Sequence, residues 1–185
     1  MRKLAFILAC CAAPAMAQDG AGPNLLIDVS GEANGRIVID LLEDVAPQHV
    51  AQIAALAEEG AYDGVVFHRV IEGFMAQTGD VECGREDAAC PAGVGGSDRP
   101  DIPAEFSDVP YDRGIVGMAR SQSPNSANSQ FFIMFDAGYF LNGQYTVVGR
   151  VIEGMEIVDA IKRGTGQNGA VVGAPDVMES VSVER

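Results

Sequence analysis

Short strand-like segments, separated by turns rich in glycine, proline and asparagine, set the fold that this chain can adopt. Asn34-Gly35, between the first two segments, is a strong hairpin signal. Only residues 47–60 and 154–164 show helical spacing of apolar residues, and the first of these opens with a proline and ends at a glycine. Many short strand-like segments together with only two helical segments predict a mainly β barrel or sandwich with helical caps. The eight expected strands are 24–30, 35–42, 65–70, 75–80, 114–120, 130–135, 145–151 and 177–185.

The first 17 residues have the layout of an export signal. Two basic residues near the start precede an apolar run, and Ala15-Met16-Ala17 forms a small-x-small cleavage site. The apolar run is too short to cross a membrane as a helix, which takes about 20 residues. We therefore expect residues 1–17 to be a secretory signal peptide that is cleaved after Ala17 on export.

The rest of the chain is expected to form a short N-terminal segment, 18–23, and one domain, 24–185. Cleavage would leave 168 of the 185 residues, which is long enough for a single hydrophobic core. A lipoprotein acylated at Cys10 or Cys11 is the alternative, although the residues before each cysteine fit a lipid-attachment pattern poorly. No other apolar segment is long enough to span a membrane, so we expect no membrane partner after cleavage.

The acidic balance of the chain argues against one class of partner. The formal net charge is −14 at pH 7, and it becomes −16 when cleavage removes Arg2 and Lys3. A surface of this charge repels the phosphates of nucleic acids, so no nucleic-acid partner is expected. The charge mainly favours solubility.

Two cysteines remain after cleavage, Cys83 and Cys90, with six residues between them. They lie in a loop-like stretch, VECGREDAACPAGVGG, and two nearby cysteines in an oxidising compartment most often form a disulfide. Such a disulfide would stabilise the fold by about 2.5 kcal/mol in the chain-entropy model. A two-cysteine metal site is the other reading, and it is weaker because no histidine lies near the pair in sequence.

Few residues could carry acid–base, nucleophilic or metal chemistry. The chain has two histidines, His49 on the first expected helix and His68 in an expected strand. We expect His49 on or near the helix surface. We expect His68 to be hydrogen-bonded in the interior, because it alternates with Arg69 along the strand. The sequence contains no GxSxG turn, no spaced histidine–carboxylate cluster and no phosphate-cradling glycine loop, so neither a metal nor a cofactor is expected.

Arg69 is unusual because its neighbours in FHRVIEGFMAQTGD, residues 67–80, are largely apolar or aromatic. A guanidinium stays charged at physiological pH and is costly to bury without a partner. Strand alternation places Phe67 on the face of Arg69, and Met75 on the face of Gln77. The position of the arginine therefore has to be explained by something other than core packing.

The segment QFFIMF, residues 130–135, supplies a second set of side chains. Alternation places Gln130, Phe132 and Met134 on one face and the other three residues on the opposite face. If these strands are neighbours, aromatic, thioether and amide groups gather around Arg69 and form a cleft for an apolar ligand that carries an amide. The alternative is that the aromatic and methionine side chains are ordinary core residues, and the charge of Arg69 argues against it.

At these residues the chain resembles the cyclophilins, the cyclophilin-type peptidyl-prolyl cis/trans isomerases, in their bacterial exported form. The resemblance runs from about Asn24 to the end of the chain. It implies a closed eight-stranded antiparallel β-barrel capped by two α-helices, isomerase activity on X–Pro bonds, and no cofactor. The motifs that carry it are FHRVIEGFMAQTGD, GMAR, NSQFFIMF and FLNGQYTVVGRVIEGMEIVD.

The resemblance implies a role for each matching residue. Arg69 matches the catalytic arginine, and Gln77 and Gln130 match polar residues that hold the peptide backbone. Ala119 and Arg120 match a neighbouring edge strand, where asparagine often stands at the position of Arg120. The pocket for the proline ring is matched by Phe74, Met75, Phe132 and Leu141.

Two further positions differ from many eukaryotic members. Phe140 stands where those members have tryptophan, and Tyr145 stands where they have histidine. Both residues resemble those of bacterial exported cyclophilins. They keep a large ring and a hydroxyl donor in place, so we expect the isomerase activity to survive.

The leading hypothesis is a monomeric periplasmic prolyl isomerase that acts on unfolded or proline-containing polypeptides and assists the folding of exported proteins. In this hypothesis Arg69 stabilises the twisted amide, is partly accessible to solvent and lies within reach of Gln77. The alternative is a proline-binding chaperone or interaction module with incidental activity. A barrel that carries an apolar small molecule is a third and weaker reading, because small barrels fill their interior with side chains.

Overall fold

The computed structural model describes residues 19–185. The predicted signal peptide, its cleavage after Ala17 and the alternative lipid attachment at Cys10 or Cys11 therefore lie outside the described residues.

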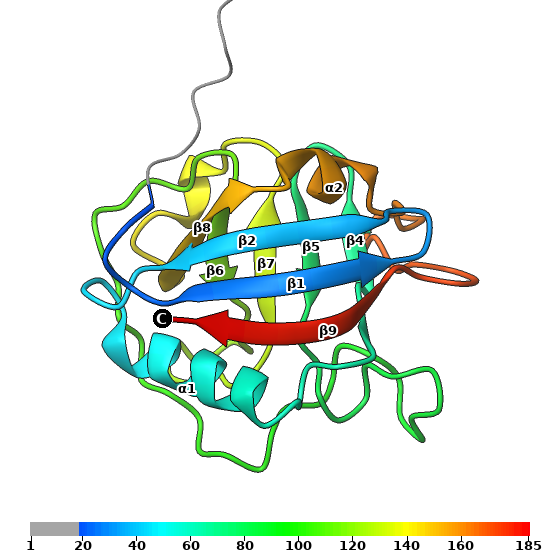
Figure 1. Ribbon diagram of the computed structural model, residues 1–185, viewed down its shortest axis with the longest axis horizontal. Helices are drawn as coiled ribbons and strands as arrows, with labels where there is room; N and C mark the ends of the chain where they lie inside the picture. The colour runs from blue at the N-terminus through cyan, green and yellow to red at the C-terminus, as the bar shows by residue number, and fades with distance from the viewer. Residues whose placement is uncertain (1–18) are drawn as a thin grey trace, which may run out of the picture.

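An antiparallel sheet of nine strands forms the framework of the described residues (Figure 1). Its strands follow the order β3-β9-β1-β2-β8-β6-β7-β5-β4, and β9, β1 and β2 lie in front of β6, β7, β5 and β4, which cross behind them. This arrangement curls the sheet into a half-barrel. The strands are β1 (Asn24–Ser30), β2 (Gly35–Leu41), β3 (Val65–Val66), β4 (Arg69–Ile71), β5 (Met75–Thr78), β6 (Ile115–Met118), β7 (Phe131–Met134), β8 (Val147–Glu153) and β9 (Val177–Glu184).

The predicted mainly β fold with two helices is confirmed, and the strand count differs for a local reason. The segment expected as one strand, 65–70, is interrupted at Phe67 and His68 and becomes β3 and β4. These two short strands are the two edges of the sheet. Within residues 19–185 no backbone hydrogen-bond ladder joins β3 to β4, and the two edges are connected only by the two residues of chain between them. We had expected backbone hydrogen bonds to close the barrel at this point.

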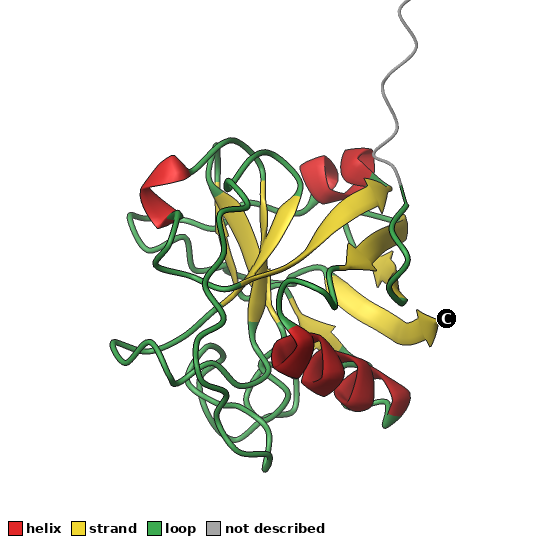
Figure 2. Ribbon diagram, turned by 90° about the vertical axis from the view of Figure 1, so that its left-hand side faces the viewer, coloured by secondary structure: helices red, strands yellow, loops and turns green. Residues whose placement is uncertain are grey.

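Two helices flank the sheet, α1 (Pro47–Glu58) and α2 (Met155–Ala160), with a short 3-10 helix, η1 (Tyr139–Leu141). In Figure 1 α1 and α2 lie at opposite sides of the strands, and Figure 2 shows η1 far from α1. α1 begins with its proline and packs against β9, whereas α2 packs against β2. No helix within residues 19–185 has the length and apolar character needed to cross a membrane.

The strands bury different residues on their two faces. In β7, Phe131 and Ile133 belong to the large cluster inside the half-barrel, whereas Phe132 and Met134 belong to a smaller cluster on its outer face. The alternation predicted for QFFIMF is therefore confirmed. The outer cluster consists of Met75, Tyr111, Ile115, Phe132, Met134, Leu141 and Val147.

The interruption between β3 and β4 overturns two predictions. Phe67 is fully buried inside the half-barrel, so it does not share the face of Arg69. His68 is half-buried outside the interior cluster, where a Cβ on Gly93 would lie 3.1 Å from its Cδ2. Within residues 19–185 neither of its ring nitrogens has a hydrogen-bond partner, and burial lowers its pKa. The alternation failed because the strand stops at Val66 and restarts at Arg69.

The prediction for His49 is also wrong. His49 is completely buried, and its Nδ1 lies 2.6 Å from Oε2 of Glu105. The carboxylate of Glu105 also accepts the backbone N–H groups of Gln48 and His49, at 3.2 and 3.1 Å. The N-cap residue of α1 makes no side-chain hydrogen bond to the first N–H groups of the helix. A carboxylate from a distant segment accepts these N–H groups in its place. Sequence periodicity could not reveal this contact.

Cys83 and Cys90 form a disulfide, with their Cα atoms 5.2 Å apart. We call residues 81–96 the disulfide loop. Cys83 is buried, and the backbone oxygen of the next residue, Gly84, accepts the N–H of Val66 in β3 at 2.8 Å.

Replacing both cysteines with serine is expected to lower the free energy of unfolding by about 2.5 kcal/mol, because the unfolded chain regains the entropy of an open loop. Guanidinium denaturation of the two proteins without reductant measures the difference. Equal unfolding midpoints would show that the crosslink does not stabilise the fold.

Glu105 predicts a dependence of stability on pH. Burial alone would raise the pKa of this carboxyl, but the hydrogen bonds from His49 and Gln48 together lower it by more, so the net pKa lies below its usual value. A lowered folded pKa contributes stability above the unfolded pKa of about 4.3, and this contribution is lost as the pH falls through the folded pKa.

Glu105→Gln is therefore expected to cost about 1 kcal/mol at pH 7, comparable to the loss of a helix cap. Urea denaturation at pH 7 and at pH 3 tests this expectation. The difference between variant and wild type should shrink at pH 3, and a difference that is constant with pH would contradict it.

Candidate functional site

The register of three strands brings the predicted site residues together. Arg69 on β4 lies opposite Gln77 on β5, and Gln77 lies opposite Phe132 on β7. Residues that are directly opposite in antiparallel strands point to the same face. These three side chains therefore form one row across the outer face of the half-barrel.

Arg69 is half-buried and held by neutral groups. Its Nε donates to the backbone oxygen of Asn168 at 2.9 Å, and its Nη1 donates to Oε1 of Gln77 at 3.2 Å. Sδ of Met75 lies 3.7 Å from the same Nη1. Within residues 19–185 the guanidinium makes no salt bridge, and Nη2 has no hydrogen-bond partner. Burial lowers its pKa. Its position is as predicted: partly accessible and within reach of Gln77.

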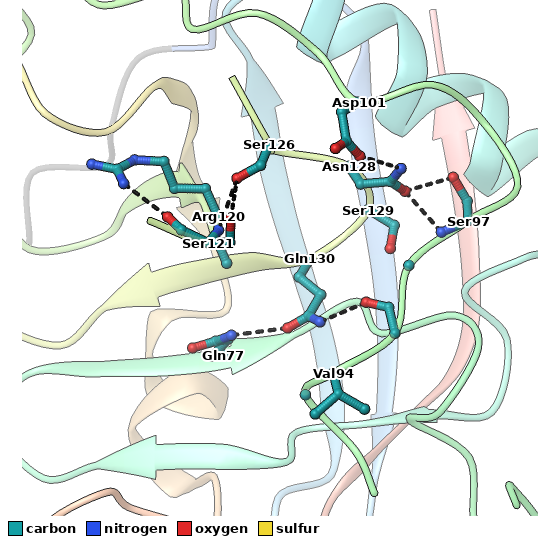
Figure 3. A pocket seen from close by; sticks show the side chains of 14 residues that line it. Gln77, Val94, Ser97, Asp101, Arg120, Ser121, Ser126, Asn128, Ser129 and Gln130 are labelled. Carbon is teal, nitrogen blue, oxygen red and sulfur yellow. Dashed lines mark hydrogen bonds between the residues drawn. The ribbon is translucent and has the colours of Figure 1, made fainter. Parts of the chain in front are cut away.

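A chain of amide hydrogen bonds continues from Arg69. Nε2 of Gln77 donates to Oε1 of Gln130 at 2.9 Å, and Nε2 of Gln130 donates to the backbone oxygen of Gly95 at 2.8 Å. Figure 3 shows the side chains of Gln77 and Gln130 pointing toward each other. The two glutamines thus join Arg69 to the disulfide loop.

Beside Arg69 lies an apolar cavity of about 260 Å³. It collects every site residue expected from the sequence except Gln130, which lines the adjoining cavity. The lining residues are Arg69, Phe74, Met75, Gln77, Ala119, Arg120, Phe132, Phe140, Leu141 and Tyr145.

Aromatic packing builds the wall of this cavity. The ring of Phe132 stacks on Tyr111, with centroids 5.9 Å apart, and meets the ring of Tyr145 edge-on at the same distance. Gly117 permits this arrangement, since a Cβ there would lie 2.4 Å from the hydroxyl of Tyr111 and 2.6 Å from Cζ of Phe132. The ring of Phe140 is 66% exposed and lies 5.5 Å from the ring of Phe74, at the rim.

Ala119 and Arg120 do not lie on an edge strand as we expected. They follow the end of β6, which pairs with β7 on one side and β8 on the other. Arg120 donates to the backbone oxygen of Gln144 from Nε and Nη2, at 3.2 and 2.9 Å. Its guanidinium also lies 4.3 Å above the ring of Tyr145. The arginine therefore supports one side of the cavity.

A second, polar cavity of about 540 Å³ adjoins the first (Figure 3). Gln77, Ala119 and Arg120 line both cavities, Gln130 lines the polar cavity alone, and the disulfide loop contributes Gly93, Val94, Gly95 and Gly96 to its wall. Sequence reasoning did not identify its other polar residues, although the run SQSPNSANS before Gln130 is dense in serine and asparagine. These residues are Ser97, Asp101, Ser121, Ser126, Asn128 and Ser129.

The arrangement suits a ligand with an apolar ring and an adjacent amide. The apolar cavity can hold a small apolar ring, and the open Nη2 of Arg69 can donate to a group beside it. The polar cavity offers amide and hydroxyl groups to a continuing chain. The residues predicted from alternation and from the family motifs thus meet at one site.

Comparison with known proteins gives the same family by sequence and by structure. Residues 26–183 match the family model described as cyclophilin-type peptidyl-prolyl cis-trans isomerase. A probable peptidyl-prolyl cis-trans isomerase of Brucella suis biovar 1 (strain 1330) is 59% identical over 154 residues, which cover 82% of this chain and 79% of that protein. Peptidyl-prolyl cis-trans isomerase B of Escherichia coli (strain K12) is 36% identical over 162 residues, covering 81% and 94%.

A solved structure supports the match at the level of the fold. The cyclophilin-type peptidyl-prolyl cis-trans isomerase of Cryptosporidium parvum, crystallised in the presence of the dipeptide Ala-Pro, superimposes with a TM-score of 0.74. It is 26% identical and covers 88% of this chain and 99% of its own. The chain belongs to the cyclophilin-type peptidyl-prolyl cis-trans isomerases.

Proposed function

We propose that this isomerase acts on X–Pro bonds of exported polypeptides in the periplasm and that Arg69 stabilises the twisted amide. The observation that carries the catalytic part is the guanidinium of Arg69, half-buried beside an apolar cavity and paired with no carboxylate within the described residues. A guanidinium that is not neutralised by the protein can interact with the substrate.

The chemistry of the X–Pro bond explains what such a group does. Amide resonance gives the C–N bond partial double-bond character, and uncatalysed rotation of an X–Pro bond crosses about 20 kcal/mol and takes tens of seconds. Rotation breaks the resonance and localises a lone pair on the proline nitrogen. A hydrogen bond from Arg69 to this lone pair is complete only in the twisted state, so it stabilises the transition state more than either ground state.

The rest of the site holds the substrate while one side of the bond rotates. The cavity of about 260 Å³ accommodates the proline ring against Phe132 and Leu141. Gln77 fixes Nη1 of Arg69 and leaves Nη2 available for the substrate. The polar cavity beyond Gln130 accommodates the chain that flanks the proline. In the Cryptosporidium relative, the dipeptide present was Ala-Pro, which contains the same bond.

Arg69→Ala is expected to lower kcat/KM by on the order of 100-fold, the usual effect of removing one donor aimed at developing charge. NMR exchange spectroscopy on a proline peptide measures the rate, and circular dichroism checks the fold. Arg36→Ala is the control, because it removes a surface arginine of β2 that pairs with Asp28 away from the site. Full activity of Arg69→Ala would refute the proposed mechanism.

The same variant separates catalysis from simple binding of unfolded chains. Phe140 and Tyr139, beside the site, are 66% and 59% exposed. These rings could bind apolar segments of an unfolded chain, as a chaperone would. If the protein is an isomerase first, Arg69→Ala slows proline-limited refolding of a client to the uncatalysed rate. If it is a binding module with incidental activity, the variant keeps full effect on clients that lack proline.

The periplasmic location rests on the N-terminal sequence. Expression of the full chain in a Gram-negative host is expected to yield a periplasmic protein that begins at Gln18, because cleavage follows the Ala15-Met16-Ala17 site. Intact mass spectrometry of the periplasmic fraction measures the terminus. A mass that retains residues 1–17, or one that carries acyl chains on Cys10 or Cys11, would contradict the proposal.

We propose that the enzyme works as a monomer on unfolded or proline-containing polypeptides. The site is formed by strands of one chain, and the formal charge of −14 opposes binding to nucleic acid.

A further inference from the structure

The disulfide loop is anchored on one buried carboxylate. Asp80 is fully buried, and its Oδ1 accepts the backbone N–H of Cys83 at 2.8 Å. Its Oδ2 accepts the backbone N–H groups of Gly93 and Gly95, at 2.6 and 3.0 Å. The same side chain thus holds both ends of the disulfide loop, because it accepts hydrogen bonds from Cys83 at one end and from Gly93 and Gly95 at the other.

The packing around Gly95 leaves it little room to move. A Cβ on this residue would lie 2.5 Å from Oδ1 of Asp80 and 3.0 Å from Sγ of Cys83. The backbone at Gly95 therefore lies directly against the carboxylate and the disulfide. The carbonyl oxygen that Gly95 presents to Gln130 is therefore confined by both groups.

That carbonyl decides which way the two glutamine amides face. Gln130 donates its Nε2 to the oxygen of Gly95, and this contact turns Oε1 of Gln130 toward Gln77. Gln77 then donates its own Nε2 to Gln130 and is left to present Oε1 to Arg69. If the amides turned over, an NH2 group would face the guanidinium, and two donors would repel each other.

We propose that Asp80 and the Cys83–Cys90 disulfide are positioning elements for Arg69, acting through Gly95, Gln130 and Gln77. The inference rests on the catalytic role proposed for Arg69. Hydrogen-bonded side chains in a low-dielectric site reinforce one another, and small displacements of a catalytic group are costly. A loop that lines the polar cavity and not the apolar one thereby governs the direction of the arginine's donors.

Asp80→Asn tests the proposal, because asparagine keeps the size of the side chain and cannot accept all three N–H groups. We expect kcat to fall about tenfold with KM little changed, since Arg69 acts in the transition state. The NMR resonance of Arg69 Nε–Hε should also shift. Asp176→Asn is the matched control: Asp176 is 1% exposed and accepts the backbone N–H groups of Ala33 and Lys162, at 2.8 and 2.6 Å. The control should keep its kcat within about twofold.

A double-mutant cycle separates positioning from general loss of structure. Gln77→Ala cuts the connection between Gln130 and Arg69, so Asp80→Asn should cost less than about threefold in that background. The same cost in both backgrounds would overturn the proposal. If Asp80→Asn does not give folded protein, the Cys83→Ser/Cys90→Ser protein takes its place in the cycle with the same expectation.

The outcomes also distinguish this inference from the proposed mechanism. Full activity of Arg69→Ala would refute the mechanism itself. A large loss in Arg69→Ala together with unchanged kcat in Asp80→Asn and in the cysteine variant would refute only the positioning role.

Discussion

The antiparallel pairing of β5 with β4 on one side and β7 on the other is the constraint on which the site depends. It fixes Arg69 opposite Gln77 and Gln77 opposite Phe132, and a shift of one residue in either pairing would turn these side chains into the interior. Interior residues of the same strands, such as Val70 and Ile133, hold that register by filling the core. The stability of the half-barrel and the geometry of the site are therefore set by the same hydrogen bonds.

Much of the fold was accessible from local sequence pattern. Period-two alternation in QFFIMF correctly divided its residues between two faces, because β7 is a regular strand with a buried residue at each position. The same rule failed at Phe67 and His68, where the chain leaves the strand between β3 and β4. Alternation holds only while backbone pairing continues, and the sequence carries no clear mark of where the pairing stops.

The site was predictable as far as it is built from strands and family motifs. Arg69, Gln77 and Phe132 belong to contiguous motifs, and the structure brings them together. Contacts made by distant irregular segments were not predictable. Glu105 reaches His49 from 56 positions along the chain, and Gly95 reaches Gln130 from 35 positions away. Such contacts depend on loop paths that have no periodic signal.

The interruption at Phe67 and His68 also limits how the sheet can pair with other polypeptides. It leaves the sheet with edge strands of only two and three residues, β3 and β4. A longer edge would present a row of unpaired backbone groups on which an extended polypeptide could add itself as a further strand. Edges this short offer almost no template for such addition, so an extended polypeptide that contacts the protein is not expected to join its sheet.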